Sequence, residues 1–440
     1  MRRLFGLVIR IFFRRVAVVG GANVPADGPV LFVLNHPNAL VDPVLLMALS
    51  PRRVVFLAKE PLFRTPVVRW FVQGVGAIPV YRRQDAADMS RNRETFASVW
   101  RELQAGGAVA VFPEGTSHSD PALRPLKTGA ARIALGASAA GDGGAVQIVP
   151  AGLYYTAKSR FRSSAVLCFG APIAVRPHPV DDGGEPDPDA VRQLTAEIER
   201  ALGGVTVQAE REKALHLVAL AERVFSAAAT SGSAPQLADR FDLRQRFMKA
   251  NDELRQIAPD RVERLERMLD QFNAELDAAG LAPESVPPRR LSPSDVASYA
   301  LRAVGFLLVT APVAIVGICT HLPAYLAIGP FVTRALGVER DTTATAKMLA
   351  AGLLYPLTWL AASGAVWHWF GAAAAVATLA ALPVTGYIAL LFAERFDRLV
   401  GAARGLGLRV FRRRAWLRLE ARRRRIRAAI EELAALRPAH

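Results

Sequence analysis

Residues 29–43 read PVLFVLNHPNALVDP, and this stretch decides the fold class. The run Val30–Leu34 is apolar without interruption, as in a strand that is buried on both faces of a parallel sheet. It ends on Asn35-His36-Pro37, and a helix can begin after Asp42-Pro43. The sequence therefore predicts a histidine and an aspartate at the carboxyl end of a buried strand, where open α/β sheets bind their ligands.

The alternation of short strands and helices continues along the chain from that stretch. We expect an α/β domain over residues 21–205, with a mixed, mostly parallel sheet flanked by helices. The expected strands are Val30–Leu34, Val54–Leu57, Ile78–Val80, Val109–Phe112, Gln147–Pro150 and Val166–Phe169. Expected helices include Pro43–Leu49 and Gly129–Ala139.

Residues 1–20 precede this domain and combine arginines with large apolar side chains. Arg3, Arg10 and Arg14 fall within about 40° of one another on a helical wheel. The pattern predicts a basic amphipathic helix lying on an anionic lipid surface. An ordinary buried helix with a charged edge is the alternative.

The second half of the chain has the composition of a membrane protein. Hydrophobic residues make up 52% of the 440 residues and charged residues 21%, which excludes an intrinsically disordered chain. Residues 303–333 and 349–392 carry no charged side chain, and a span needs about 20 residues. We expect a membrane region over 295–395, with a hairpin at 348–393 that turns near Trp367-His368-Trp369.

Residues 303–333 leave two topologies open. They form a re-entrant segment or two short helices that break at His321-Leu322-Pro323, or else one span, which would place the N-terminal domain outside. We expect the former, because the chemistry described below uses cytosolic substrates. The arginines that follow the hairpin then lie in the cytoplasm by the positive-inside rule. The expected location is the cytoplasmic membrane, with the active site facing the cytoplasm.

Two further segments complete the organisation. Residues 206–290 are charged and helical in period, so we expect a helical accessory region there. Residues 396–440 read as an arginine-rich cytoplasmic tail. The chain carries a net charge of +16, and a basic segment beside membrane spans favours anionic membrane lipid as a partner over nucleic acid.

The chemistry predicted for the domain rests on His36 and Asp42. A histidine oriented by a carboxylate can act as a general base toward an alcohol, although an aspartate at this place can also simply cap a helix. With two cysteines, Cys168 and Cys319, the chain offers neither a disulfide framework nor a thiolate metal site, and we expect no metal. No Gly-x-Ser-x-Gly elbow or P-loop occurs in the sequence.

Three more blocks follow in order and give the sequence a family resemblance: GAIPVYR at 76–82, FPEGTS at 112–117 and IVPA at 148–151. Together with the His36 block they resemble the glycerolipid acyltransferases, which act on glycerol 3-phosphate and 1-acylglycerol 3-phosphate. The resemblance covers about residues 20–205, and its most specific part is Phe-Pro-Glu-Gly-Thr. One departure is the spacing, because five residues separate His36 from Asp42 where most of the family has four.

The resemblance implies an activity and a set of site residues. His36 would deprotonate the hydroxyl of a glycerol-phosphate acceptor, which attacks an acyl thioester, and Asp42 would orient His36. Either acyl-CoA or acyl-carrier protein would be the donor, as a co-substrate, and no cofactor is implied. The residues implied in acceptor binding are Gly76, Arg82, Glu114, Gly115 and Thr116, with Lys127 just downstream as a further candidate.

Other interpretations stay open at this point. The acceptor could instead be a lysophospholipid or an amino-lipid, or the chain could be a non-catalytic, lipid-binding membrane protein. His118 and Asp120 follow the glutamate block without a strand of their own, and we interpret them as polar loop residues.

Overall fold

The fold is described from a computed structural model over residues 2–64, 69, 72–81, 92–139, 145–158, 160–181, 185–208, 212–228, 236–283, 293–335 and 343–436. The chain forms two compact units. The first comprises Met1–Glu210 and Glu339–Thr345, and the second comprises Arg211–Val338 and Ala346–His440.

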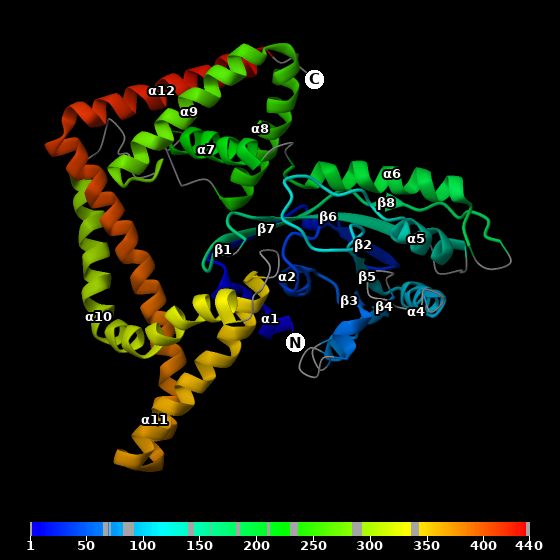
Figure 1. Ribbon diagram of the computed structural model, residues 1–440, viewed down its shortest axis with the longest axis horizontal. Helices are drawn as coiled ribbons and strands as arrows, with labels where there is room; N and C mark the ends of the chain where they lie inside the picture. Colours follow the sequence, from blue (N-terminus) through cyan, green and yellow to red (C-terminus); the bar gives the residue numbers. More distant parts are fainter. Residues whose placement is uncertain are drawn as a thin grey trace. The chain divides into compact units, whose positions relative to one another are not determined.

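The first unit is built on a sheet whose strand order is β1-β7-β6-β2-β5-β3-β4, with β8 paired to β6 (Figure 1). The pairs of β6 with β7 and with β8 are antiparallel, and the others are parallel. The strands are β1 Arg15–Val19, β2 Val30–Leu34, β3 Val54–Lys59, β4 Ile78–Val80, β5 Ala108–Val111, β6 Gln147–Tyr155, β7 Ser164–Phe169 and β8 Ile173–Ala174. The predicted mixed, mostly parallel sheet is confirmed.

Strand β2 lies at the centre, between β5 and β6. Every residue of β2 and β5 is buried, because helices cover both faces of a parallel sheet. Residue pairing sets Val33 beside Val111 of β5, and Leu34 beside Ala151 of β6. All three strands run in the same direction, so the segments that follow β2 and β5 meet the end of β6 at one edge of the sheet.

Helices form layers against the sheet. The helices α4 Asn92–Gln104, α5 Gly129–Ala139 and α6 Pro188–Val205 pack on one another, with contacts to β4, β5 and β6. The helices α1 Arg2–Phe12 and α2 Val41–Leu49 pack together, and α2 contacts β3 and β7. These layers hold the carboxyl ends of the central strands in place.

Residues 1–20 do not form the single helix that the sequence predicted. Helix α1 ends at Phe12, and the β-branched run that follows becomes β1, which pairs with β7 at the edge of the sheet. Helix α1 buries Phe5, Ile9 and Phe12, while Leu4 and Leu7 are 59% and 56% exposed. The helix therefore has one face packed in the protein and one apolar face outside it.

The second unit contains a helical bundle. Its members are α7 Glu212–Ala228, α8 Leu237–Ile257, α9 Pro259–Ala279 and α12 Arg413–Ala435. Their shared core includes Val224, Phe272, Trp416 and Ile426. The arginine-rich segment is thus helical and packed: Trp416 and Ile426 of α12 are buried, and several of its arginines pair with carboxylates. Those pairs are Arg422 with Glu275, Arg423 and Arg424 with Glu420, and Arg427 with Glu431.

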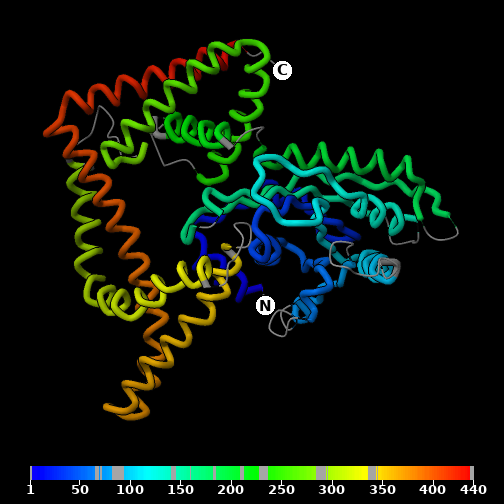
Figure 2. Tube along the Cα trace, viewed as in Figure 1, coloured from blue at the N-terminus to red at the C-terminus, as the bar shows by residue number. Residues whose placement is uncertain are grey.

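Two long helices in the second unit are apolar and long enough to cross a membrane: α10 Pro293–Pro330 and α11 Thr343–Phe411. Only 22% and 17% of their most apolar windows are buried, whereas the core helix of a water-soluble domain would be mostly buried. Helix α11 turns back on itself, as Figure 2 shows, and its one non-helical residue is Gly371, at φ 82°. This reversal lies two residues after Trp367-His368-Trp369, where the sequence predicted the turn of a hairpin.

Helix α10 stays helical through His321-Leu322-Pro323, where the sequence suggested a break. Pro312 and Pro323 lie inside it, and prolines inside a helix bend it without ending it. The His321 side chain packs against α11, because the Trp359 indole N–H donates to its Nε2 at 2.9 Å. This histidine is an interface residue between two apolar helices.

Candidate active site

His36 and Asp42 come together at the carboxyl end of β2. The His36 Nδ1 and an Asp42 carboxylate oxygen are 2.8 Å apart, and Asp42 is fully buried in the first turn of α2. Since the carboxylate can only accept, Nδ1 carries the proton and the neutral ring presents Nε2 as a base. The His36 side chain keeps 17% of its surface exposed, whereas Asp42 has none.

The five-residue spacing is absorbed by a turn between the two residues. The Asn38 N–H donates to the Asp42 carboxylate at 2.7 Å, and the Val41 N–H donates to the Asn38 carbonyl at 2.9 Å. Ala39 lies in the left-handed region at φ 32°, which costs free energy for a residue with a Cβ. The strained turn accommodates the extra residue and leaves the histidine–aspartate pair intact.

Tyr155, the last residue of β6, completes the surroundings of Asp42. Its hydroxyl donates to the second Asp42 oxygen at 2.6 Å, and the ring is buried. Burial and then the charge of Asp42 raise the pKa of Tyr155 well above its ordinary value of 10.0, so the hydroxyl stays a donor at neutral pH. Tyr155 was not among the site residues predicted from the sequence.

Glu114 holds the segment after β2, which contains His36, at a second point. It follows β5, and one of its oxygens accepts the His36 backbone N–H at 3.0 Å. The other oxygen accepts the Arg124 backbone N–H at 2.9 Å and forms a hydrogen bond with His118 Nε2. The Glu114 side chain has no exposed surface.

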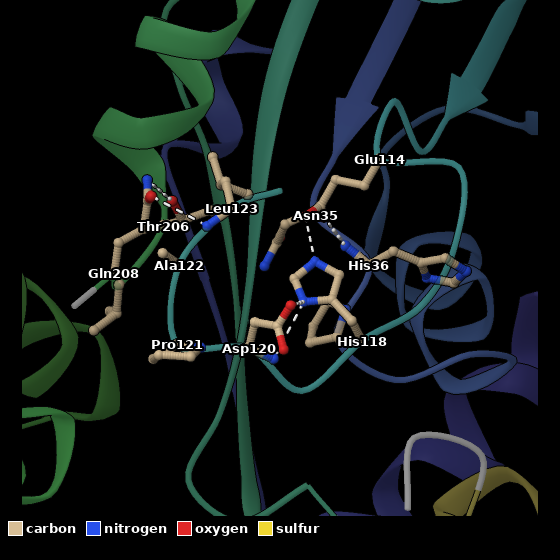
Figure 3. Close-up of a pocket in the computed structure, with 12 residues that line it drawn as sticks. Asn35, His36, Glu114, His118, Asp120, Pro121, Ala122, Leu123, Thr206 and Gln208 are labelled. Atoms are coloured by element: carbon tan, nitrogen blue, oxygen red, sulfur yellow. Dashed lines mark hydrogen bonds and ion pairs between the residues drawn. The ribbon is translucent and has the colours of Figure 1, made fainter. Parts of the chain in front are cut away.

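His118 lies in the loop after β5, as predicted, but its side chain is not exposed to solvent. It is buried, with its ring between Glu114 and Asp120, as Figure 3 shows. Its Nδ1 accepts the Asp120 backbone N–H at 3.2 Å, and its carbonyl accepts from Lys158 Nζ at 3.2 Å. Asp120 itself is exposed, as predicted, and a hydrogen bond from Arg124 lowers its pKa below the ordinary 3.8.

Phe112 provides a flat support for the His36 ring. The two ring centroids are 3.9 Å apart and the planes are inclined by 15°, which is a stacked arrangement. Phe56 of β3 stacks behind Phe112 at 6.2 Å. Three contacts therefore fix His36: a carboxylate at Nδ1, a second carboxylate at its backbone N–H, and an aromatic face.

A pocket opens beside this cluster (Figure 3). His36, Glu114 and His118 line it together with residues from the segment after β5 and from the end of α6. Those residues are Asp120, Pro121, Ala122, Leu123, Thr206, Val207 and Gln208, with Asn35 and Pro37 beside His36. Within the described residues, no group of three His, Cys, Asp or Glu could hold a metal ion.

The remaining predicted residues divide into two groups. Gly115 has a φ of 74°, and a Cβ on it would overlap the Lys127 amine, so Lys127 lies against the turn that holds Gly115 and Thr116. Gly76, at φ 72°, lies two residues before β4, which is separated from β2 by β5 and β3. Arg82 lies outside the described residues.

Comparison with known proteins agrees with this geometry. Residues 15–154 match the family model described as Acyltransferase. The match covers about a third of the chain. The matched residues contain the His36, Gly76–Arg82, Phe112–Ser117 and Ile148–Ala151 blocks, so the resemblance drawn from those blocks is confirmed.

Relatives with assigned functions extend the match beyond this domain. Glycerol-3-phosphate O-acyltransferase 2 of Saccharomyces cerevisiae is 25% identical over 64% of this chain and 51% of the yeast protein. The 1-acyl-sn-glycerol-3-phosphate acyltransferase of Borreliella burgdorferi is 28% identical over 38% of this chain and 62% of that protein. The chain thus spans about half the length of the yeast relative. The crystal structure of the 1-acyl-sn-glycerophosphate acyltransferase from Thermotoga maritima aligns at 23% identity and a TM-score of 0.34, over 46% of this chain and 76% of that one.

Proposed function

We propose that the chain is a membrane-bound O-acyltransferase that moves a fatty acyl group from a thioester donor to a hydroxyl of a glycerol-phosphate acceptor. The observation that carries the proposal is the His36 ring, whose Nδ1 is held by buried Asp42 while its side chain stays partly exposed. The acceptors named for the yeast and Borreliella relatives are glycerol 3-phosphate and 1-acyl-sn-glycerol 3-phosphate. Phospholipid synthesis is the process that uses both.

The proposed reaction needs one proton shuttle and no acyl-enzyme. His36 Nε2 takes the proton of the acceptor hydroxyl as its oxygen attacks the thioester carbonyl carbon. Asp42 stabilises the imidazolium that forms. The tetrahedral intermediate then collapses, the carbon–sulfur bond breaks, and the imidazolium returns the proton to the thiolate. An ester and a free thiol leave, and His36 is neutral again.

The acceptor phosphate needs cationic groups within reach of the pocket. The Lys127 amine lies against Gly115, whose missing side chain leaves room for it. This amine, the Gly115-Thr116 turn, Gly76 and Arg82 are the candidates for phosphate and glycerol contacts, because exposed amides and fixed cations bind phosphate. Both acyl-CoA and acyl-carrier protein are compatible with the chemistry as donors.

The second unit would anchor the enzyme in the cytoplasmic membrane. The second leg of α11, residues 371–392, is uncharged over about 22 residues, or about 33 Å of helix, close to the thickness of a hydrocarbon core. Trp367, Trp369 and Phe370 are exposed at its turn, as interfacial aromatics are. The charged ends, Lys347 and Arg395, then lie on one side. By the positive-inside rule that side is the cytoplasm.

Anionic lipid is the proposed partner of the arginines nearest this boundary. Arg395 stacks over the Phe306 ring of α10 at 5.0 Å, and Arg302 is exposed at the same end of α10. Helix α12 begins 21 residues after Phe392, which is about 30 Å of helix, and screening limits surface attraction to about 8 Å. The boundary arginines therefore suit headgroups better than the tail proposed from the sequence, and the apolar face of α1 is a second candidate contact.

The decisive experiment is acyl transfer by membranes that carry the protein, with glycerol 3-phosphate and 1-acylglycerol 3-phosphate compared for wild type and His36→Ala. We expect a product from at least one acceptor and a loss of about 10²- to 10⁴-fold in the variant. Exposed His178→Gln, outside the pocket, is the matched control. Repeating the assay with acyl-CoA and acyl-carrier protein identifies the donor.

Other results of the same assay would favour the alternatives. Product formed only from lysophospholipids or amino-lipids would keep the chemistry and change the acceptor. Tight lipid binding with no turnover of any acceptor would favour a non-catalytic lipid-binding protein, and in that case His36→Ala would leave binding unchanged.

A further inference from the structure

The protein itself occupies most of the acceptor positions of Glu114. A carboxylate offers about four acceptor positions. Three are taken, by the His36 backbone N–H, the Arg124 backbone N–H and His118 Nε2. Because the side chain has no exposed surface, the fourth position cannot be reached by a ligand in the pocket. A direct hydrogen bond to an acceptor hydroxyl, the role that the family resemblance implies, has no room here.

His118 has a defined hydrogen-bond state. The Asp120 backbone N–H donates to Nδ1, so Nδ1 is unprotonated and the ring proton lies on Nε2, which points at Glu114. A buried carboxylate costs free energy unless donors surround it, and His118 supplies the only side-chain donor to Glu114 among the described contacts. His118 therefore holds the Glu114 carboxylate in one orientation.

The backbone of the two loops is cross-linked at the same place. The His118 N–H donates to the His36 carbonyl at 3.1 Å, while the His36 N–H donates to Glu114 at 3.0 Å. Both polar groups of the His36 peptide backbone thus bind the segment after β5. Loss of either contact would let the His36 base shift from its place, and a displacement of about 1 Å can cost 10²-fold in rate.

We propose that Glu114 and His118 are a positioning pair: His118 fixes Glu114, and Glu114 holds the His36 backbone so that its ring stays aligned with the acceptor hydroxyl. The pair touches neither substrate. The proposal rests on the proposed acyl transfer and assigns to the glutamate a role in kcat instead of a role in acceptor binding.

Steady-state kinetics separate the two roles. For Glu114→Gln we expect kcat to fall about 10- to 100-fold with the acceptor KM within about 2-fold of wild type, because the amide repels one of the three donors. For His118→Ala we expect a loss of similar size. His118→Gln, which can place an amide N–H near the former Nε2, should recover most of it. The double variant Glu114→Gln, His118→Ala should lose no more than the larger single loss.

A second readout does not depend on turnover. Hydrogen exchange by mass spectrometry over the peptide that contains His36 should be faster in Glu114→Ala and His118→Ala than in wild type, and unchanged in His178→Gln. Wild-type membranes without acyl transfer would reject the proposed function, and the exchange data would still test the pairing. A raised acceptor KM at unchanged kcat in Glu114→Gln, or unchanged exchange at His36 in both alanine variants, would overturn the positioning role.

Discussion

Two buried carboxylates hold His36 from opposite sides, and they do different work. Asp42 contacts the imidazole itself and carries the charge that stabilises the protonated ring. Glu114 contacts only the backbone N–H of the same residue. Each accepts three hydrogen bonds from the protein, and each side chain is fully buried. Burial and the number of hydrogen bonds alone therefore do not identify the carboxylate that takes part in proton transfer, whereas the atom that it contacts does.

The largest expected effect is on the Asp42 side. In Asp42→Asn the charge is lost and the amide can hold the ring in the wrong tautomer, so kcat should fall about 10³-fold or more. Initial rates at saturating acceptor measure this, with thermal unfolding as the check on folding. A loss no greater than that of Glu114→Gln would reverse the ranking of the two carboxylates.

Tyr155→Phe should have the next largest effect, because it removes one donor from Asp42 while keeping the ring. A hydrogen bond to a charged group contributes about 1.5–3 kcal/mol to stability. We expect the free energy of unfolding to fall by about this amount and kcat to fall about 10-fold as Asp42 loses its fixed orientation. Urea titration and initial rates measure the two effects. Unchanged stability would mean that the carboxylate finds another donor.

The stability of Tyr155→Phe should also differ from that of wild type at alkaline pH. The raised pKa of Tyr155 means that the folded protein keeps this proton above pH 10.0, where the unfolded chain releases it. Stability from Tyr155 is therefore fully present below pH 10.0 and declines as pH rises toward the folded-state pKa. Wild type should lose stability relative to Tyr155→Phe above that pH, and a constant difference would contradict the assignment.

Phe112→Leu tests the aromatic stacking that supports the His36 ring between Asp42 and Glu114. An aromatic stack contributes about 0.5–1.5 kcal/mol, so we expect kcat to fall about 3- to 10-fold with little change in the acceptor KM. The control is Phe56→Leu, one ring further from His36, which should alter stability more than rate. Equal kinetic losses in both variants would indicate a general packing defect.

The Asp42 side was largely predictable from the sequence and the Glu114 side was not. Asp42 follows His36 on one continuous stretch, so an apolar strand and a helix start were sufficient to bring them together. Tyr155 lies 113 residues from Asp42, and a tyrosine that ends a strand is ordinary in sequence. It is informative only once the pairing of Leu34 with Ala151 shows that β6 continues past the end of β2.

His118 and β1 show two other limits of prediction from the sequence. His118 lies in a segment without periodicity, so nothing in the sequence indicates that its ring is buried against Glu114. Residues 15–19 fitted the helical charge pattern of residues 1–20, yet their β-branched side chains pair with β7. In both cases partners far along the chain decide the structure, and local patterns cannot report them.

The smallest expected effect concerns Asp120, a carboxylate beside the same cluster but half exposed. Its bond with Arg124 lowers its pKa, so its contribution to stability is present above pH 3.8 and is lost as pH falls through the lowered folded-state pKa. Solvent screening keeps that contribution small. In Asp120→Asn we expect a slight loss of stability at neutral pH that disappears in acid. We also expect an unchanged kcat, because the backbone N–H of this residue holds His118 Nδ1 at 3.2 Å, whereas its half-exposed carboxylate lies further away, at 3.5 Å. Acid titration of unfolding and initial rates measure both. A fall in kcat as large as that of His118→Ala would show that a third carboxylate belongs to the Glu114 side.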